Sequence, residues 1–186
     1  MPFGKLPAIE VDGKIIADSD NIHRWLEAQG HDFDTGLSDL DRANARAFIR
    51  MAEEHMYFHQ VLDRWGDEAN WAVVRHEYFA FLPPVLRTLV PNKLRRDLMR
   101  TMNGQGLGRL APAERLERIE PDLKAITARL KASPFLFGDV PSAADASVGA
   151  MIGAIAAAPK PTQLSRRVAD DGLLSAYAAR CAQAMG

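Results

Sequence analysis

The first thirty residues show a spacing of apolar positions that differs from the rest of the chain. Two short runs rich in β-branched and small apolar residues, 8–11 and 14–17, flank the dipeptide Asp12-Gly13. A two-residue Asp-Gly link between such runs is a strong hairpin signal, because both of its residues readily adopt a positive φ. The pattern therefore predicts a β-hairpin at the N-terminus.

A helix is predicted directly after this hairpin. Ile22, Trp25 and Leu26 follow at helical spacing, so the helix should run from about Ser19 to Gln29 and stop at Gly30. We expect Ser19 to be its N-cap, since a serine hydroxyl can accept from the free N–H groups of the first turn.

Beyond Gly36 the apolar positions recur at helical spacing almost to the end of the chain. The longest stretch begins at Leu40 and ends near Trp65. Its predicted apolar stripe consists of Ala43, Ala47, Phe48, Met51, Ala52, His55, Phe58, His59 and Leu62. Such a pattern is typical of a long helix with one buried face.

Prolines and glycines divide the remaining sequence into further helices. Pro83-Pro84 and Pro91 should each interrupt a helix, and the run Gly104–Gly108 should form a turn. The predicted helices span residues 71–82, 85–90, 92–102, 115–132 with Pro112 in the first turn, a segment that begins at Ser142, and 173–184. One hairpin and about seven helices make the predicted fold mainly α.

Length and composition fit a compact protein of one domain, or one domain with a fragment of a second. The chain has 186 residues, of which 47% are hydrophobic. A chain of this length buries about 70% of its unfolded surface, so it needs no disulfide or metal to hold a core. Its one cysteine, Cys181, excludes an intramolecular disulfide and favours a reduced, cytoplasmic protein. The longest weakly polar run, 146–158, is too short to span a bilayer.

The net charge of −1 offers no strong global argument for nucleic acid or a membrane surface as a partner. Residues 1–70 carry 7 Lys/Arg and 14 Asp/Glu, whereas residues 71–186 carry 16 and 10. We interpret this asymmetry as two solvated faces. The basic cluster Lys93, Arg95, Arg96 and Arg100 is likewise interpreted as a solvated helix face.

His55 and His59 are four residues apart, a spacing that can hold a metal on one helix. They share their predicted face with Met51, Phe58 and Leu62, so we expect packed or hydrogen-bonded histidines and no metal. A metal-binding helical protein is the alternative interpretation of this pair.

Two sequence segments resemble the glutathione S-transferase superfamily. The segment 4–19, Gly-Lys-Leu-Pro-Ala-Ile-Glu-Val-Asp-Gly followed by Ala17-Asp18-Ser19, resembles the third and fourth strands and third helix of its thioredoxin-like domain. The segment 135–146 resembles the capping box of the core helix in its all-helical C-terminal domain. In such a box Ser142 caps the helix and Asp145 accepts from the Ser142 N–H, which is a structural role.

Further stretches are similar to the metaxin and failed-axon-connections branch of that superfamily. They are residues 48–57, 104–109 and 134–139. The resemblance implies a partial thioredoxin-like segment over 1–30 and a helical C-terminal domain over 37–186. It also implies a homodimer, and the open edge of the hairpin would favour pairing.

The resemblance implies a glutathione site in the N-terminal segment. Leu6 would pair through its backbone with the cysteinyl part of glutathione, before a cis bond to Pro7, and Asp18 and Ser19 would receive the γ-glutamyl end. Glutathione would be substrate or ligand, and no other cofactor is implied.

A second substrate would lie against the long helix. The residues that we place there are Arg50, Met51, Glu54 and Tyr57.

The sequence departs from the family where the catalytic residue is expected. The residue that activates the glutathione thiol lies on a first β-α-β unit, which needs about 30 or more residues and precedes the segment that begins here. No catalytic residue is therefore assigned. We expect a truncated sequence rather than a natural remnant, because a lone hairpin leaves the sheet unfinished.

Two functions follow as hypotheses. The first is glutathione binding, with transferase activity if an upstream β-α-β unit exists. The alternative is a non-catalytic helical module of the metaxin type that binds other proteins.

Overall fold

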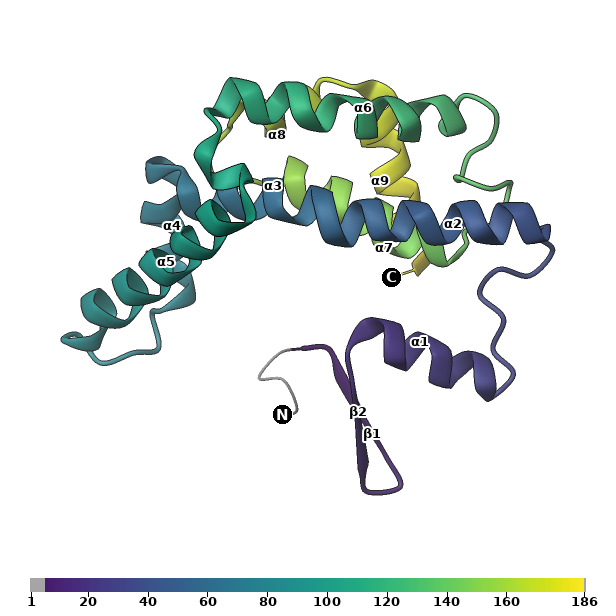
Figure 1. Ribbon diagram of the computed structural model, residues 1–186, viewed down its shortest axis with the longest axis horizontal. Helices are drawn as coiled ribbons and strands as arrows, with labels where there is room; N and C mark the ends of the chain where they lie inside the picture. Colours follow the sequence, from purple (N-terminus) through teal and green to yellow (C-terminus); the bar gives the residue numbers. More distant parts are fainter. Residues whose placement is uncertain (1–5, 186) are drawn as a thin grey trace. The chain divides into compact units, whose positions relative to one another are not determined.

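The computed structural model describes residues 6–185, and the chain divides into two compact units (Figure 1). The first unit is Met1–Leu37 and the second is Ser38–Gly186.

The first unit contains the predicted hairpin. Strands β1 (Ala8–Val11) and β2 (Lys14–Ala17) pair antiparallel, with Ile9 opposite Ile16. Asp12 and Gly13 adopt φ angles of 49° and 73°, as a two-residue hairpin turn requires. The hairpin prediction is therefore confirmed down to its turn residues.

Helix α1 (Ser19–Ala28) follows the hairpin, but the prediction that Ser19 caps it is wrong by one residue. The N-cap is Asp18, whose Oδ1 accepts from the N–H groups of Asp20 at 3.0 Å and Asn21 at 3.4 Å. Asp18 has a φ of 81°, and this conformation turns its carboxylate toward the open end of the helix. Ser19 becomes the first helical residue.

Among the described residues of the second unit, all regular elements are helical, as predicted. Its first helical rod, Asp39–Gly66, consists of α2 (Asp39–Met51), the π-helical η2 (Ala52–Met56), α3 (Tyr57–Val61) and the π-helical η3 (Leu62–Gly66). The elements that follow are α4 (Glu68–Tyr78), α5 (Leu86–Gln105), the 3-10 turn η4 (Leu107–Arg109), α6 (Pro112–Leu130), α7 (Ala143–Ala156), α8 (Gln163–Ala169) and α9 (Gly172–Met185). Among the described residues, no helix is both long and apolar enough to cross a bilayer.

The long rod was predicted correctly, but part of its buried face was not. Ala52, His59 and Leu62 are buried, whereas Ala43 and Ala47 are exposed. The core-facing residues of the rod are Ala45, Ile49, Ala52, Met56, His59, Val61 and Leu62. Alanine fits either face of a helix, so the burial of the larger Ile49 and Met56 decides the register.

Three helix predictions in the second half require correction. Helix α4 begins three residues earlier than predicted and ends at Tyr78, not Leu82. Residues 85–90 and 92–102 belong to one helix, α5, which continues through the buried Pro91. A proline inside a helix removes one backbone hydrogen bond, and here that loss does not end the helix. Helix α8 was missed, although Thr162 and Ser165 form a capping box at its start.

The Gly104–Gly108 run is only partly the predicted turn. Gly104 and Gln105 complete α5, and Gly106 ends it with a φ of 113°. Residues 107–109 then form η4. Gly106 is thus the one position of this run where the helix stops.

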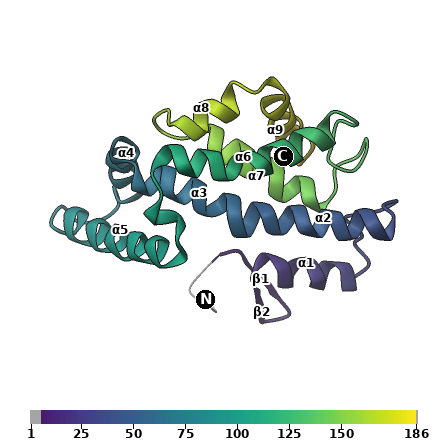
Figure 2. The same cartoon turned by 45° about the horizontal axis from the view of Figure 1, so that its top comes forward.

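Helix α7 packs against α2, α8 and α9 (Figures 1 and 2). The predicted capping box is present, since the Ser142 N–H and hydroxyl both donate to Asp145 Oδ2, at 2.8 and 2.7 Å. The other oxygen, Oδ1, accepts from the Leu136 N–H at 2.9 Å and the Tyr177 hydroxyl at 2.8 Å. Asp145 therefore joins three segments of the chain.

Gly149 allows the backbones of α7 and α9 to approach closely. A Cβ at this position would lie 2.5 Å from Cys181 Cβ and 2.6 Å from its Sγ. At Gly153, on the same helix, nothing lies within 4 Å of an added Cβ. The two glycines therefore differ in steric room, and Gly149 marks the contact between the helices.

We expect Gly149→Ala to destabilise the protein by about 1–3 kcal/mol, because the added methyl forces α7 and α9 apart. The measurement is urea unfolding followed by circular dichroism. Gly153→Ala is the matched control and should stabilise by about 0.5–1 kcal/mol, since alanine is the better helix former. Equal effects of the two variants would contradict the close contact.

We expect Asp145→Ala to cost more than the roughly 0.5–2 kcal/mol that loss of a cap alone costs, because it also leaves buried donors of Leu136 and Tyr177 without an acceptor. Chemical unfolding measures the change. Asp139→Ala, which removes an exposed carboxylate from the same loop, should change stability by less than about 0.5 kcal/mol. A loss for Asp145→Ala no larger than for Asp139→Ala would exclude the bridging role of Asp145.

Candidate functional site

The four predicted glutathione residues come together in the first unit. The Leu6–Pro7 bond is cis, as the family resemblance implies. The Asp18 N–H donates to the Pro7 carbonyl at 3.1 Å and so joins the start of β1 to the start of α1. All four residues, including Leu6 and Ser19, are exposed. The structure therefore presents them as one continuous surface.

The start of α1 retains hydrogen-bonding capacity on this surface. Asp18 uses Oδ1 for its two capping bonds, and among residues 6–185 its other oxygen, Oδ2, has no hydrogen-bond partner. Ser19 does not serve as the cap, and its hydroxyl has no hydrogen-bond partner among the same residues. The N-terminal end of a helix attracts anions through its free N–H groups and its dipole. Cationic and anionic groups of a ligand could thus be held side by side here.

The residues predicted for a second substrate lie on one face of the rod. Arg50, Glu54 and Tyr57 are spaced by four and three residues, so they follow one another along the helix surface. Arg50 Nη1 lies 3.4 Å from Glu54 Oε1 and 3.8 Å from Glu53 Oε2. Tyr57 is exposed, and Met51 is half-buried beside Arg50. This face combines one cation, two carboxylates and two larger apolar groups.

The histidine pair is packed and hydrogen-bonded. His55 Nδ1 lies 2.5 Å from Asp122 Oδ2, and the Nε2 atoms of His55 and His59 are 3.4 Å apart. An ionised carboxylate only accepts, so His55 Nδ1 carries the proton toward Asp122. In neutral His55 the Nε2 atom then accepts from His59 Nε2–H. Among the described residues, no cluster of three or more His, Cys, Asp or Glu could hold a metal ion.

This arrangement keeps His59 neutral. Burial, and after it the charge of His55 when that ring is protonated and the charges of Arg115 and Arg118, lower the pKa of His59 to about 3. Its Nδ1 atom is buried and has no partner among the described residues. An unprotonated Nδ1 is a bare acceptor, and a lone pair costs less to bury unpaired than an N–H or a charge.

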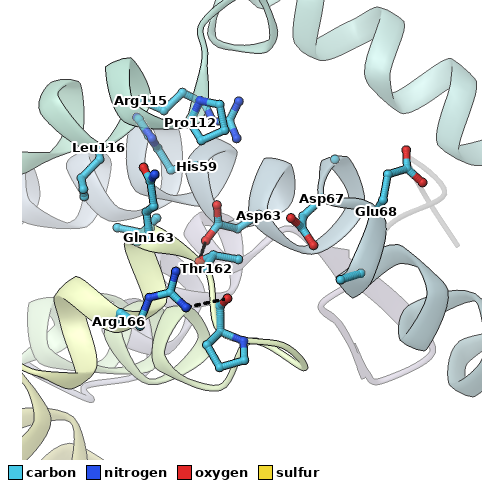
Figure 3. A pocket seen from close by; sticks show the side chains of 14 residues that line it. His59, Asp63, Asp67, Glu68, Pro112, Arg115, Leu116, Thr162, Gln163 and Arg166 are labelled. Carbon is cyan, nitrogen blue, oxygen red and sulfur yellow. Dashed lines mark hydrogen bonds between the residues drawn. The ribbon is translucent and has the colours of Figure 1, made fainter.

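His59 also lines a polar pocket of about 640 Å³ between η3 and the starts of α6 and α8 (Figure 3). Asp63 lies at its centre and accepts from the Thr162 hydroxyl, and burial raises the pKa of the Asp63 carboxyl. Arg166 donates to the Pro161 carbonyl at 3.2 Å. The pocket is therefore lined by both carboxylates and guanidinium groups, which suits water or a small polar molecule.

The sequence did not reveal this pocket. Asp63 and Thr162 are 99 residues apart, and Arg115 comes from a third element. The one local signal was the Thr162–Ser165 capping box, which fixes the start of α8 and points to a helix rather than to a pocket.

Two glutathione S-transferase domain families match the chain. The N-terminal domain of glutathione S-transferases matches residues 1–70, and the C-terminal domain matches residues 111–180. No solved structure matches the chain.

The curated relatives include a glutathione S-transferase and members of the metaxin and failed-axon-connections branch. The isoprene-epoxide–glutathione S-transferase of Rhodococcus sp. (strain AD45) is 33% identical over 168 residues, which cover 86% of this chain and 68% of that protein. Human metaxin-2 is 24% identical over 184 residues, covering 98% and 70%. Failed axon connections of Drosophila melanogaster is 30% identical over 155 residues, covering 76% and 36%. The chain belongs to the glutathione S-transferase superfamily, and its relatives include the metaxin and failed-axon-connections branch.

We expect stability to fall as the pH is lowered from about 6.5 toward 3, because the unfolded His59 binds a proton that the folded one does not. A single group of this kind contributes a slope of at most about 1.4 kcal/mol per pH unit. Urea unfolding at a series of pH values from neutral to mildly acidic measures it. His59→Gln should flatten the slope, whereas His76→Gln, which removes an exposed histidine from α4, should leave it unchanged. Identical slopes in all three proteins would contradict the assignment.

Proposed function

We propose that this protein binds glutathione at the surface formed by Leu6, Pro7, Asp18 and Ser19. The observation that carries the proposal is the hydrogen bond from Asp18 N–H to the Pro7 carbonyl, which joins the two halves of this surface. Support also comes from the glutathione S-transferase N-terminal domain match over residues 1–70.

The γ-glutamyl end of glutathione carries an ammonium group and a carboxylate on one carbon. The ammonium group would bind the Asp18 Oδ2 atom, which is not used for capping. The carboxylate would bind the Ser19 hydroxyl at the N-terminal end of α1. The Leu6 backbone would pair with the cysteinyl part. The ammonium group of the ligand thus meets a carboxylate oxygen, and its carboxylate meets a hydroxyl at the positive end of the helix dipole.

We propose transferase activity for a form that includes the first β-α-β unit. In that reaction the glutathione thiolate attacks an electrophilic carbon. With an epoxide, the class named in the Rhodococcus relative, the ring C–O bond breaks and the oxygen takes a proton. The face of Arg50, Met51, Glu54 and Tyr57 is our candidate for holding the electrophile. In such a form the thiol-activating residue would lie on that unit.

A non-catalytic module that binds other proteins is the second candidate. The alignment with metaxin-2 favours it, since it extends over 98% of this chain. Such a module needs no thiol activation. The two candidates therefore differ in whether glutathione is bound and whether it is turned over.

We expect Ser19→Ala to weaken glutathione binding about tenfold, because one hydrogen bond to a charged ligand group is lost. The measurement is calorimetric titration of glutathione into the protein isolated from its native source and into its recombinant variants. The Asp18 cap is intact in this variant, so α1 should remain folded.

Thr88→Ala is the matched control, since it also removes an exposed hydroxyl but lies in the second unit. Its glutathione affinity should equal that of the wild type. Equal affinities of all three proteins would exclude the proposed surface. Absence of both binding and turnover would favour the interaction module.

A further inference from the structure

The connection between α4 and α5 exposes an unusual number of large apolar side chains. The exposed fractions are 79% for Phe81, 75% for Val85 and 64% for Leu89. Tyr78, Leu86 and Leu94 add to the same part of the chain. We call residues 78–94 the α4–α5 tip. Exposed large apolar side chains gathered in one part of a structure are typical of an interaction site.

The tip projects from its unit. In Figures 1 and 2, α4 and the first half of α5 extend beyond the bundle of α2, α6, α7 and α9. Its turn is held in place by Arg87, whose Nε donates to the Leu82 carbonyl and whose Nη2 donates to the Ala80 carbonyl, both at 2.6 Å. The apolar residues are therefore presented on a preformed turn at the end of this projection.

Positive charge follows the apolar residues along α5. Residues 79–96 contain four Lys/Arg and no Asp/Glu, although Glu77 and Asp97 lie at the two ends of this segment. Lys93 and Arg100 both bind Asp97, at 2.8 and 3.0 Å, and Arg95 binds Glu68 at 2.8 Å. Among the described residues, Arg96 has no ion-pair partner. The segment therefore keeps a positive excess even after its ion pairs are counted.

Apolar and basic side chains lie on one stripe of α5. Leu86, Leu89, Lys93, Arg96 and Arg100 are separated by three, four, three and four residues, which is the spacing of a single helix face. Along this stripe the apolar residues lie nearest the turn and the basic residues lie further from it.

We propose that the α4–α5 tip docks on the surface of an anionic lipid bilayer. Phe81, Val85 and Leu89 would enter the boundary between headgroups and acyl chains, while Arg96 and its basic neighbours remain at the level of the lipid phosphates. The positive charge beside the apolar residues favours an anionic surface as the occupant.

The first experiment is sedimentation of the full chain with vesicles. Vesicles of phosphatidylcholine with about 30% phosphatidylserine should bind the protein, and pure phosphatidylcholine vesicles should bind it at least about tenfold less. Raising NaCl from about 0.1 to about 0.5 M should weaken binding, because salt screens the attraction of the basic residues. Val85→Glu should reduce binding at least about tenfold, because a charge replaces an inserting apolar group.

Val140→Glu is the matched control. Val140 is as exposed as Val85, at 75%, and the substitution changes the net charge by the same amount, but it lies in the loop before α7. Its binding should stay within about twofold of the wild type. Equal losses in the two variants would show a general effect of charge and would overturn the proposal.

The second experiment detects insertion directly with an environment-sensitive fluorophore on an introduced cysteine. The native Cys181 is buried and burial raises its pKa to about 11, so a maleimide at neutral pH reacts with the introduced thiol. The label in Val85→Cys should shift to shorter wavelength with anionic vesicles, and the label in Val140→Cys should not.

No vesicle binding by the wild type would overturn the proposal. A second result would also overturn it: the wild type associates with itself as its concentration rises, Val85→Glu abolishes this association, and vesicles leave it unchanged. The tip would then bind a second copy of the chain. Sedimentation velocity without lipid distinguishes that result.

Discussion

The helical unit depends on the buried carboxylate of Asp145. It accepts four hydrogen bonds, from Leu136, from the Ser142 N–H and hydroxyl, and from Tyr177. A buried carboxylate is tolerated only when its oxygens are fully hydrogen-bonded, so these partners have to be in place together. Burial and the Asp145 carboxylate raise the pKa of Tyr177, so that its hydroxyl remains a donor. One side chain thus fixes the preceding loop, the start of α7 and the position of α9.

The contact between α7 and α9 has two levels, each with its own physical basis. Asp145 and Gly149 are one helical turn apart on α7, and Tyr177 and Cys181 are one turn apart on α9. The first level is a hydrogen bond and sets the register of the helices. The second is a close steric approach and sets their separation. Each level needs one residue from α7 and one from α9, so the residues of one helix fix how the other packs against it.

Local features were predictable from the sequence, and features that depend on distant residues were not. The Asp12-Gly13 turn and the Ser142–Asp145 box depend on residues at most three apart, and both predictions are confirmed. The partners of Asp145 on α9 and in the loop carry no local signal. The Ser19 cap was misplaced because the choice between neighbouring Asp18 and Ser19 depends on backbone angles. Pro91 was predicted to break a helix, but α5 continues through it. Pro91 is buried, and this burial cannot be read from the neighbouring sequence.

The residues proposed to bind glutathione and those proposed to bind a bilayer belong to different parts of the chain. The surface for glutathione is built by the start of β1 and the start of α1, whereas the apolar tip is built by α4 and α5. Substitution in one need not alter the other, because they lie in different compact units. A superfamily that includes both a named transferase and metaxins is consistent with this division, since a fold does not determine function and a site can be lost while its scaffold remains. The Asp145 network lies in neither surface, so it preserves the helical scaffold whichever function the chain performs.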